Sequence, residues 1–347
     1  GINRGAGPNE KNVSQSEVMN QSLPVIFDSF NNLRVLIIGD VMLDSYIWGA
    51  VERISPEAPV PIVTVKKRDV RLGGAANVAL NIQALGAQPV LVALCGNDDA
   101  GKKLQTILDQ QNMTTEGLVV SKDRPTTVKT RVIASSQHVV RVDEEQDKVS
   151  STEEEKQLIN RVEQLLPTCQ VVVFEDYDKG VISAALIEKT VALAHKNNIP
   201  TVVDPKKRNF LSYKGVSLFK PNLKEMREGL KIELETGNQK QLEAGVAVLK
   251  ERLGVEGVMA TLSEHGVYID YHQEKIKLPA HPREIADVSG AGDTVVSIAA
   301  LCVALNLSPR LIAALSNLGG GLVCQHVGVV PVNKQELLHE AIELKLG

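Results

Sequence analysis

The sequence predicts an α/β fold, in which a doubly wound, mostly parallel sheet has a small antiparallel β lid standing off it. Three observations support this prediction. From about residue 150 onward, short β-branched runs that end in acidic residues alternate with segments of helical periodicity. Two earlier segments, residues 47–65 and 126–142, instead alternate apolar and polar residues, as strands with one exposed face do. The length of 347 residues suits one large domain with a small appendage.

The N-terminal residues 1–21 are rich in Asn, Ser, Gly and Glu and show no apolar periodicity, so we expect a flexible leader there. The folded domain is expected to span residues 22–347. It begins with a continuous apolar strand over residues 33–40, which ends in Asp40, and Asp44 follows shortly after. Two acids beyond the carboxyl end of a central parallel strand lie where open α/β sheets bind small ligands.

Between the two alternating segments, residues 71–77 read Arg-Leu-Gly-Gly-Ala-Ala-Asn and run into a short helix over residues 78–86. Gly73 and Gly74 allow the backbone to approach a ligand closely, and the Asn77 amide can hydrogen-bond a polyhydroxylated ligand. A tight turn that merely requires a positive φ explains the same residues equally well.

Residues 96–103 follow a strand at 89–94 and almost fit the phosphate-binding pattern G-x-x-x-x-G-K-[ST]. Lys103 replaces the hydroxyl residue that should hold Mg²⁺, and Asp98 with Asp99 would repel phosphates. We therefore do not interpret this segment as a P-loop.

The second half of the chain shows the strand and helix rhythm of a parallel sheet. The expected elements are helices at 152–166 and 182–196 and strands at 170–176, 200–204, 218–222, 255–261 and 267–271. Polar residues that follow parallel strands meet at one edge of the sheet. Asn222 and Glu225, one helical turn apart, could there hold the water shell of Mg²⁺. Taken singly, each is better explained as an N-cap Asn or a solvated Glu.

The composition narrows the class of protein. Hydrophobic residues make up 43%, charged residues 23% and aromatic residues 3%, and the formal net charge is −4. We therefore expect no nucleic-acid surface. No apolar run is long enough for a membrane span, and the N-terminus shows no apolar core of a signal peptide. Four well-separated cysteines with apolar neighbours predict reduced, buried thiols in a cytoplasmic protein, namely Cys95, Cys169, Cys302 and Cys324.

Residues 287–294 read Asp-Val-Ser-Gly-Ala-Gly-Asp-Thr and open a long apolar segment that suits a buried helix. The backbone N–H groups of Gly290, Ala291 and Gly292 would be open to a phosphate at the helix N-terminus. Asp293 would then accept the proton of a hydroxyl that attacks the phosphoryl group. A plain helix N-terminus with an acidic first turn explains the stretch about as well. Because a helix N-terminus lowers the pKa of a carboxyl group, we expect Asp293 to be a weak base that acts mainly by positioning.

Residues 73–77 (Gly-Gly-Ala-Ala-Asn) and 287–293 (Asp-Val-Ser-Gly-Ala-Gly-Asp) resemble, in order and spacing, the two signatures of the ribokinase-like (PfkB) carbohydrate kinase family. The resemblance covers nearly all of residues 33–332. It implies a ribokinase-like fold and the transfer of a phosphoryl group from ATP to a sugar, with Mg²⁺ as cofactor.

The resemblance also implies a role for each matching position. Asp293 is similar to the catalytic base of the family, and Gly290, Ala291 and Gly292 to its anion hole. The sugar-binding positions are Asp40, Asp44, Gly73, Gly74 and Asn77. The positions for Mg²⁺, held through water, and for the phosphates are Asn222 and Glu225. The nucleotide is expected at Thr261, Ser263, Gly266, Asn317 and His326, and a monovalent cation such as K⁺ near Asp287.

Four further stretches, residues 39–44, 53–61, 176–180 and 204–206, resemble family members that phosphorylate D-glycero-β-D-manno-heptose 7-phosphate. Such members often carry a fused nucleotidyltransferase domain, and the resemblance here covers the kinase part. It implies phosphorylation of the anomeric hydroxyl to the 1,7-bisphosphate, a step of ADP-heptose synthesis for lipopolysaccharide. The substrate is expected to contact Asp176 and, through its phosphate, the cations Arg131, Arg141, Lys179 and Lys206.

Other interpretations remain open. The chain could be a kinase of the same family that acts on another sugar, sugar phosphate or nucleoside, or a non-catalytic sugar-binding sensor. A sensor has no need of Asp293 beside a bound phosphate. A Rossmann oxidoreductase is disfavoured because no G-x-G-x-x-G follows the first strand. Since a small sheet with an exposed face commonly pairs with a partner, we expect a homodimer through the lid strands at 47–65 and 126–142.

Overall fold

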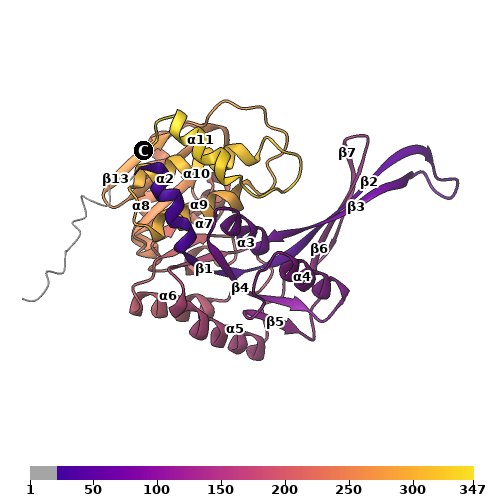
Figure 1. The fold of residues 1–347 in the computed structure, drawn as a ribbon, viewed down its shortest axis with the longest axis horizontal. Helices are drawn as coiled ribbons and strands as arrows, with labels where there is room; N and C mark the ends of the chain where they lie inside the picture. The colour runs from indigo at the N-terminus through magenta and orange to yellow at the C-terminus, as the bar shows by residue number, and fades with distance from the viewer. Residues whose placement is uncertain (1–21) are drawn as a thin grey trace, which may run out of the picture.

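The computed structural model describes residues 22–347, so the expected leader at residues 1–21 lies outside the described residues. The chain forms a nine-stranded sheet and a four-stranded sheet (Figure 1). The strands are β1 (Arg34–Gly39), β2 (Val41–Ile54), β3 (Pro61–Gly74), β4 (Gln88–Gly96), β5 (Leu118–Ser121), β6 (Thr127–Ala134), β7 (Gln137–Glu144), β8 (Val171–Glu175), β9 (Thr201–Asp204), β10 (Leu218–Phe219), β11 (Gly257–Thr261), β12 (Val267–Tyr271) and β13 (Glu274–Leu278). The helices are α2 (Leu23–Ser29), α3 (Ala75–Ala84), α4 (Asp99–Gln110), α5 (Thr152–Leu165), α6 (Ala184–Lys196), α7 (Leu223–Leu230), α8 (Gln239–Leu253), α9 (Ala291–Ala304), α10 (Pro309–Val323) and α11 (Lys334–Glu343).

The large sheet has the strand order β13-β12-β11-β10-β9-β8-β1-β4-β5. The strands from β11 to β5 run parallel, and only the edge pairs β11/β12 and β12/β13 are antiparallel. The predicted doubly wound, mostly parallel sheet is confirmed. Its carboxyl edge therefore gathers the ends of β1, β8, β9 and β11, as open α/β sheets do at their ligand sites.

Helices cover both faces of the large sheet, with α3, α9 and α10 on one face and α5, α6 and α8 on the other (Figure 1). Consecutive residues of β1 show why its sequence is a solid apolar run. Val35 and Ile37 belong to the core on the first face, while Leu36 and Ile38 belong to the core on the second face. Because side chains alternate along a strand, a strand buried on both faces must be apolar at every position.

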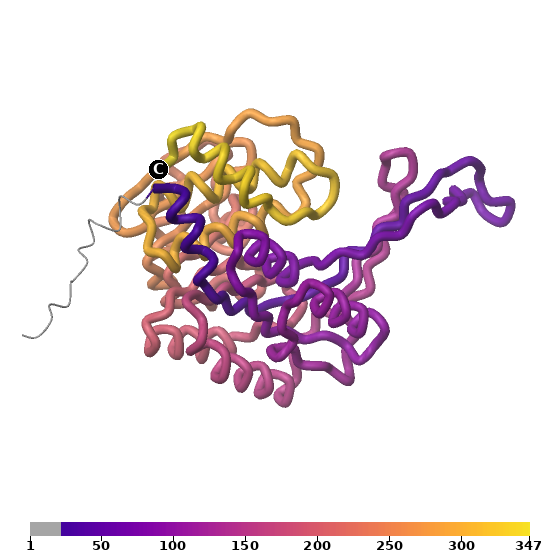
Figure 2. The backbone as a smooth tube through the Cα atoms, in the orientation of Figure 1, coloured from indigo at the N-terminus to yellow at the C-terminus, as the bar shows by residue number. Residues whose placement is uncertain are grey.

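The four-stranded sheet has the order β3-β2-β6-β7 and projects from the main domain as an arm (Figure 2). It is the predicted lid, and its outer pairs β2/β3 and β6/β7 are antiparallel hairpins. The two strands at its centre, β2 and β6, are parallel, so the lid is not antiparallel throughout. Both of these strands leave the main domain in the same direction, since Met42 pairs with Thr127 near the domain and Gly49 with Ala134 further out.

The structure shows why two glycine-containing stretches, residues 73–74 and 96–103, have their sequences. Gly73 and Gly74 end strand β3, where they pair with Met42 and Val41, and α3 begins directly after them. In the stretch that resembles a P-loop, the Asp98 carboxylate accepts hydrogen bonds from the Gly101 N–H at 2.7 Å and from Thr126. A carboxylate thus fills the loop that a phosphate would need, in agreement with the prediction.

The prediction of buried thiols is met by the described residues. The four cysteines are free and buried. Within residues 22–347, every helix is too short or too polar to span a membrane.

Candidate functional site

A cavity of about 670 Å³ opens at the carboxyl edge of the large sheet. Its walls come from the ends of β8, β9 and β11, from the start of α7 and from the N-terminus of α9. Segments that are far apart in the sequence therefore meet here. Of the predicted site residues, those that line the cavity are Lys206, Asn222, Glu225, Thr261, Ser263, Gly266, Gly290, Ala291, Gly292, Asp293 and Asn317.

The glycine turn before α9 forms one wall. Gly290 is the N-cap of α9 with a φ of 76°, a left-handed conformation that favours glycine. A Cβ atom at Gly290 would lie 3.0 Å from Nδ2 of Asn77 and 3.2 Å from the Val329 side chain. The first backbone N–H groups of a helix lack partners within the helix. Gly292 presents such a group at the cavity wall, whereas the Ala291 N–H donates to the Val288 carbonyl at 3.3 Å. The turn therefore has the geometry of an anion site.

Asp293 lies in the first turn of α9 and is only 4% exposed. Its carboxylate accepts hydrogen bonds from the Tyr177 hydroxyl at 2.7 Å and from the Asn77 amide at 2.8 Å. Burial raises the pKa of Asp293 to about 6, although the bonds from Tyr177 and Asn77 oppose the shift. The prediction of a weak base is therefore wrong in direction, because burial outweighs the helix terminus that the sequence revealed.

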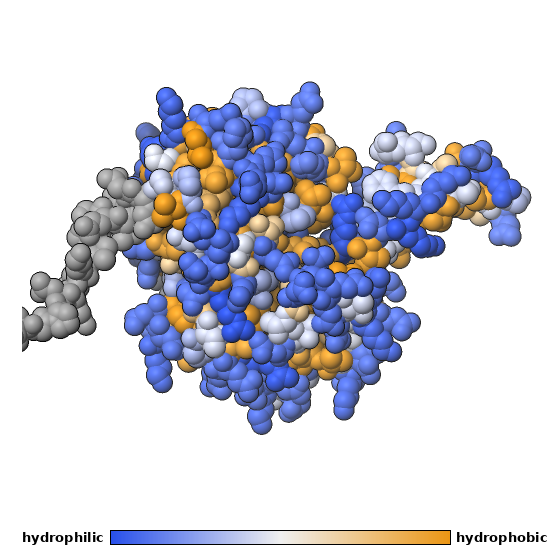
Figure 3. Space-filling view, viewed as in Figure 1, coloured by the Kyte–Doolittle hydropathy of each residue, from blue (hydrophilic) through white to orange (hydrophobic). Residues whose placement is uncertain are grey.

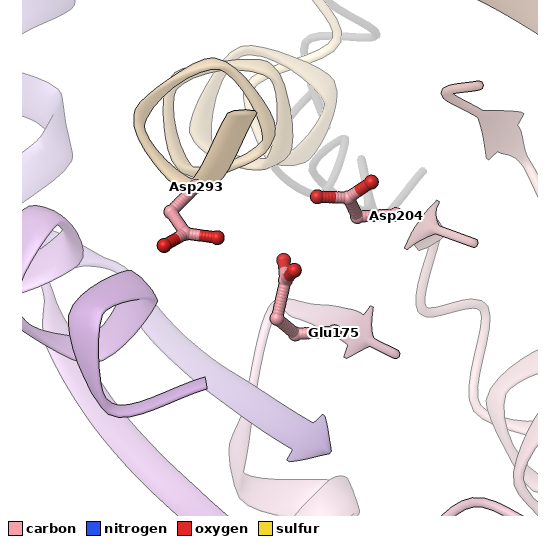
Figure 4. A group of neighbouring side chains, drawn as sticks. All are labelled: Glu175, Asp204 and Asp293. Atoms are coloured by element: carbon pink, nitrogen blue, oxygen red, sulfur yellow. The ribbon is translucent and has the colours of Figure 1, made fainter. Parts of the chain in front are cut away.

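Three acids from three elements meet beside the turn (Figure 4). Carboxylate oxygens of Glu175, Asp204 and Asp293 all lie within 4.8 Å of one another. Glu175 is 1% exposed, and its Oε2 has no hydrogen-bond partner among residues 22–347. Burial and the charges of Asp204 and Asp293 raise the pKa of Glu175 well above its ordinary value. The buried Lys220 ammonium, 3.3 Å from Asp204 Oδ1, supplies a compensating positive charge.

This group of oxygens fits a hard divalent cation. The candidate ligands are carboxylates, which Mg²⁺ prefers, and the unpartnered Glu175 Oε2 is a buried acceptor that a cation or its water would satisfy. Glu225, the residue predicted to hold Mg²⁺ through water, lines the same cavity.

For Asn222 and Glu225 the sequence left open a role in capping a helix and a role in holding Mg²⁺, and the structure is compatible with both. Asn222 is the N-cap of α7, and its side chain accepts a hydrogen bond from the Glu225 N–H at 2.8 Å. Glu225 Oε1 in turn accepts from the Asn222 N–H at 2.9 Å, while Oε2 lies 3.4 Å from Lys206 Nζ. Glu225 is buried rather than solvated, and the capping box holds it at the cavity wall.

The predicted sugar end lies at the base of the lid. Asp44 forms an ion pair with Arg131 at 2.7 Å. A Cβ atom at Gly73 would overlap with the Asp44 carboxylate, so a larger residue at position 73 would displace the Asp44 side chain. Asp40 accepts hydrogen bonds from the N–H groups of Tyr177, Lys179 and Val181 at 2.8, 3.3 and 3.2 Å. In this structure Asp40 thus holds the loop that carries Tyr177, and a contact between Asp40 and a sugar stays a prediction.

The structure places Asp176 away from the cavity. Its carboxylate is buried and accepts hydrogen bonds from the Tyr213 hydroxyl at 2.6 Å and from Asn209 Nδ2 at 3.2 Å. Burial and the nearby Asp40 raise the pKa of Asp176 to about 7. Side chains alternate at the end of a strand, so Glu175 faces the cavity and Asp176 is turned away from it into protein. In this structure Asp176 thus stabilises the packing of Tyr213 and Asn209, and its contact with a substrate stays a prediction.

Three of the four cations predicted to hold the substrate phosphate, Arg131, Arg141 and Lys179, are not among the described residues that line the cavity. Arg131 and Lys179 are largely buried and pair with Asp44 and with Glu145. Arg141 is 56% exposed on the lid and pairs with Asp143. Their contact with a substrate phosphate stays a prediction.

At the nucleotide end, Gly266 has a φ of 89°, and a Cβ atom there would overlap with the Leu278 carbonyl. His326, predicted to border the nucleotide, is exposed and is not among the described residues that line the cavity. Asp287 accepts hydrogen bonds from the Ser289 N–H at 2.9 Å and the Gly328 N–H at 2.9 Å. Burial alone would raise the pKa of Asp287. The two N–H bonds and a third bond from the Ser289 hydroxyl outweigh burial and lower that pKa.

Sequence reasoning did not assign roles to Tyr177, Glu175, Asp204 and Lys220. The available signal was position, since Glu175 and Asp204 end strands β8 and β9 and Lys220 directly follows β10. Which of the polar residues at a strand end turns toward the cavity depends on the last residue of the strand, and sequence patterns place that boundary only approximately.

Residues 32–335 match the model of the pfkB family of carbohydrate kinases. The chain is 42% identical over 320 residues to "bifunctional protein HldE" of Caulobacter vibrioides, a match that covers 92% of this chain and 65% of the relative. It is 38% identical over 309 residues to the protein of the same name from Desulfatibacillum aliphaticivorans, covering 89% of this chain and 63% of the relative. The chain thus spans less than two thirds of the length of these curated relatives.

The fold is similar to that of phosphofructokinase-2 from Escherichia coli, solved in complex with potassium. The TM-score is 0.75 at 20% sequence identity, and the similarity covers 90% of this chain and 99% of that protein. The predicted ribokinase-like fold is therefore confirmed.

Proposed function

This chain belongs to the pfkB family of carbohydrate kinases, and on that premise we propose that it phosphorylates the anomeric hydroxyl of D-glycero-β-D-manno-heptose 7-phosphate. Membership of the family makes the chain an ATP-dependent sugar kinase. The product of the proposed reaction is the 1,7-bisphosphate, which would feed ADP-heptose synthesis for the lipopolysaccharide core.

The observation that supports the proposed reaction best is the position of Asp293. It lies between the glycine turn, which has the geometry of an anion site, and Asn77 at the sugar end, which donates to it at 2.8 Å. A sugar hydroxyl held at this point would face a phosphoryl group bound to the N–H groups of the turn. Two stretches that resemble heptose kinases, residues 176–180 and 204–206, also reach the site through Tyr177 and Asp204.

The chemistry is an in-line displacement. The oxygen of the anomeric hydroxyl forms a bond to the γ-phosphorus of ATP, the bond from that phosphorus to the β,γ-bridging oxygen breaks, and ADP leaves. Asp293 takes the proton of the hydroxyl. With a pKa of about 6, Asp293 is ionised at neutral pH and yet more basic than an ordinary Asp. The N–H group of Gly292, at the N-terminus of α9, stabilises the charge of the group in transfer.

A bound Mg²⁺ would neutralise phosphate charge at this site. The side chains that would hold it, directly or through water, are Glu175, Asp204 and Glu225. Asp287 is proposed to border a K⁺ site, in line with the potassium in the solved E. coli phosphofructokinase-2.

The reaction is tested by measuring ADP release against a panel of sugars. We expect D-glycero-β-D-manno-heptose 7-phosphate to give the highest kcat/KM, and the unphosphorylated heptose, ribose and fructose 6-phosphate to give much lower values. Turnover of ribose or fructose 6-phosphate without turnover of the heptose phosphate would leave the family assignment intact and refute the proposed substrate. Binding of a sugar without ADP release would favour the sensor instead.

A further inference from the structure

Arg71 joins the lid to a loop at the opposite end of the chain. It lies on β3, and its Nη1 donates a hydrogen bond to the Val329 carbonyl at 3.1 Å across 258 residues of sequence. Its Nε forms an ion pair with Asp69 at 3.0 Å. The guanidinium also lies over the Tyr46 ring, 4.9 Å from the ring centroid. Arg71 is partly buried, so these contacts fix its side chain in one position.

The loop that Arg71 reaches is held against the glycine turn. The Gly328 N–H donates to Asp287, the first residue of the turn segment, at 2.9 Å. The Val329 side chain is the neighbour that a Cβ atom at Gly290 would meet at 3.2 Å. Further along, the Val332 N–H donates at 2.9 Å to Asn81 Oδ1. The shape of the anion site therefore depends on a loop that Arg71 holds from the side of the lid.

On the other side, Arg71 belongs to a set of contacts that ends at the sugar site. The Tyr46 ring also lies near the guanidinium of Arg131, 5.6 Å from its centroid. Arg131 forms the ion pair with Asp44, and Arg71 lies directly opposite Asp44 in the pairing of β2 with β3. A shift of Asp44 on binding a sugar would displace Arg131 and, through the Tyr46 ring, reach Arg71, because these side chains are in contact.

We propose that Arg71 is a positioning residue that couples occupation of the sugar site at Asp44 to the geometry of the glycine turn at Gly290. Arg71 is not placed in contact with the reacting atoms. It acts by holding Val329 against the turn when the lid is in its substrate-bound position. The coupling rests on the proposed sugar kinase reaction, whereas the hold on the loop does not.

The first test needs no ligand. In Arg71→Ala, amide hydrogen exchange of Gly328 should speed up by about tenfold, since one hydrogen bond of about 1.4 kcal/mol corresponds to that factor. Arg68→Ala is the matched control, because Arg68 is exposed on the same strand and an odd number of residues away, so its side chain points to the opposite face. Unchanged exchange at Gly328 in Arg71→Ala would overturn the proposal.

The second test measures how strongly a bound nucleotide changes the affinity for the sugar. Trp48 is the single tryptophan of the chain and stacks on Tyr46 with ring centroids 5.8 Å apart, so its fluorescence reports on this cluster. The affinity for the sugar phosphate that gives the highest ADP release is measured with and without a non-hydrolysable ATP analogue and Mg²⁺. We expect the nucleotide to tighten sugar binding by at least about fivefold in the wild type and in Arg68→Ala, and by less than about twofold in Arg71→Ala.

Turnover separates positioning from a general loss of structure. In Arg71→Ala, kcat should fall by about tenfold or more while the KM for ATP changes by less than about threefold, and added guanidinium at millimolar concentration should restore part of kcat. A variant with unchanged coupling and unchanged kcat would refute the role of Arg71. If the wild type turns over a sugar other than the heptose phosphate, only the proposed substrate fails, and both tests still decide the role of Arg71.

Discussion

At Asp293, two opposing influences act on one carboxyl group. Burial raises its pKa, and the hydrogen bonds from Tyr177 and Asn77 lower it, with a balance at about 6. A carboxyl group with this pKa is ionised at pH 7 and protonated below pH 6. Activity that requires the carboxylate should therefore fall as the pH drops through 6.

Replacing Tyr177 by Phe tests this balance. The change removes a hydrogen bond to the carboxylate, so the pKa of Asp293 should rise and the acid limb of the pH profile of kcat should move to higher pH by about one unit. Tyr213→Phe is the matched control, since that hydroxyl donates to Asp176 instead. A limb that stays in place in Tyr177→Phe, or moves equally in the control, would contradict the role of Tyr177.

At the scale of elements, the glycine turn positions the site. Gly290→Ala should lower kcat by about tenfold, because a Cβ atom at a φ of 76° is strained and meets Asn77 and Val329. Gly254 offers a matched control, with a φ of 60° at the end of α8 and nothing in the described chain within 4 Å of a Cβ atom. Gly254→Ala should lose a similar amount of stability in thermal unfolding and keep its kcat. Equal kcat values in the two variants would show that the turn does not position the phosphoryl group.

Glu225, at the start of α7, caps the helix and is also proposed to hold Mg²⁺ through water. In Glu225→Gln, the remaining Oε1 can still accept from the Asn222 N–H, so the thermal stability should change little. The charge at the cavity is lost, and the Mg²⁺ concentration needed for half-maximal activity should rise severalfold. Glu336→Gln serves as the control, because Glu336 occupies the first turn of α11, away from the cavity. An unchanged Mg²⁺ requirement in Glu225→Gln would contradict a role for Glu225 at the metal.

The sequence predicted elements better than their contacts. The strand runs, the order of helices and strands and the glycine turn followed from local periodicity, which the chain itself displays. The alternation that separates Glu175 from Asp176 depends on the end of β8, and the parallel pairing of β2 with β6 depends on the direction of two strands that are far apart in sequence. The pKa of Asp293 depends on burial by several elements. These three properties arise only from tertiary structure, and they are where the predictions differed from the structure.

For the whole molecule, we propose that the lid is the surface that pairs with a second copy of the chain. Figure 3 shows apolar surface along the arm. The strands and hairpin loop of the lid expose six large apolar side chains, namely Val51, Ile54, Val60, Val65, Val140 and Val142. Val140 and Val142 are 50% and 51% exposed on the edge strand β7. A second copy that covers this surface would also protect the sheet edge.

The proposed homodimer is tested by light scattering at micromolar concentration. The parent should have the mass of two chains, and the double variant Val140→Lys with Val142→Lys should have the mass of one. Val120→Lys is the control, because Val120 is 47% exposed on β5, outside the lid. A parent protein that is monomeric under these conditions would refute the dimer.

Asp293 is the proposed base of a phosphoryl transfer to a sugar, and the reaction depends on it. The most direct measurement compares kcat for ADP release by the wild type and by Asp293→Asn, with D-glycero-β-D-manno-heptose 7-phosphate, ATP and Mg²⁺ all saturating. The asparagine keeps the size of the side chain and cannot take the proton, so kcat should fall by at least about 100-fold while nucleotide binding persists. A variant whose kcat stays within about threefold of the wild type, well short of the loss expected for a missing base, would contradict this account.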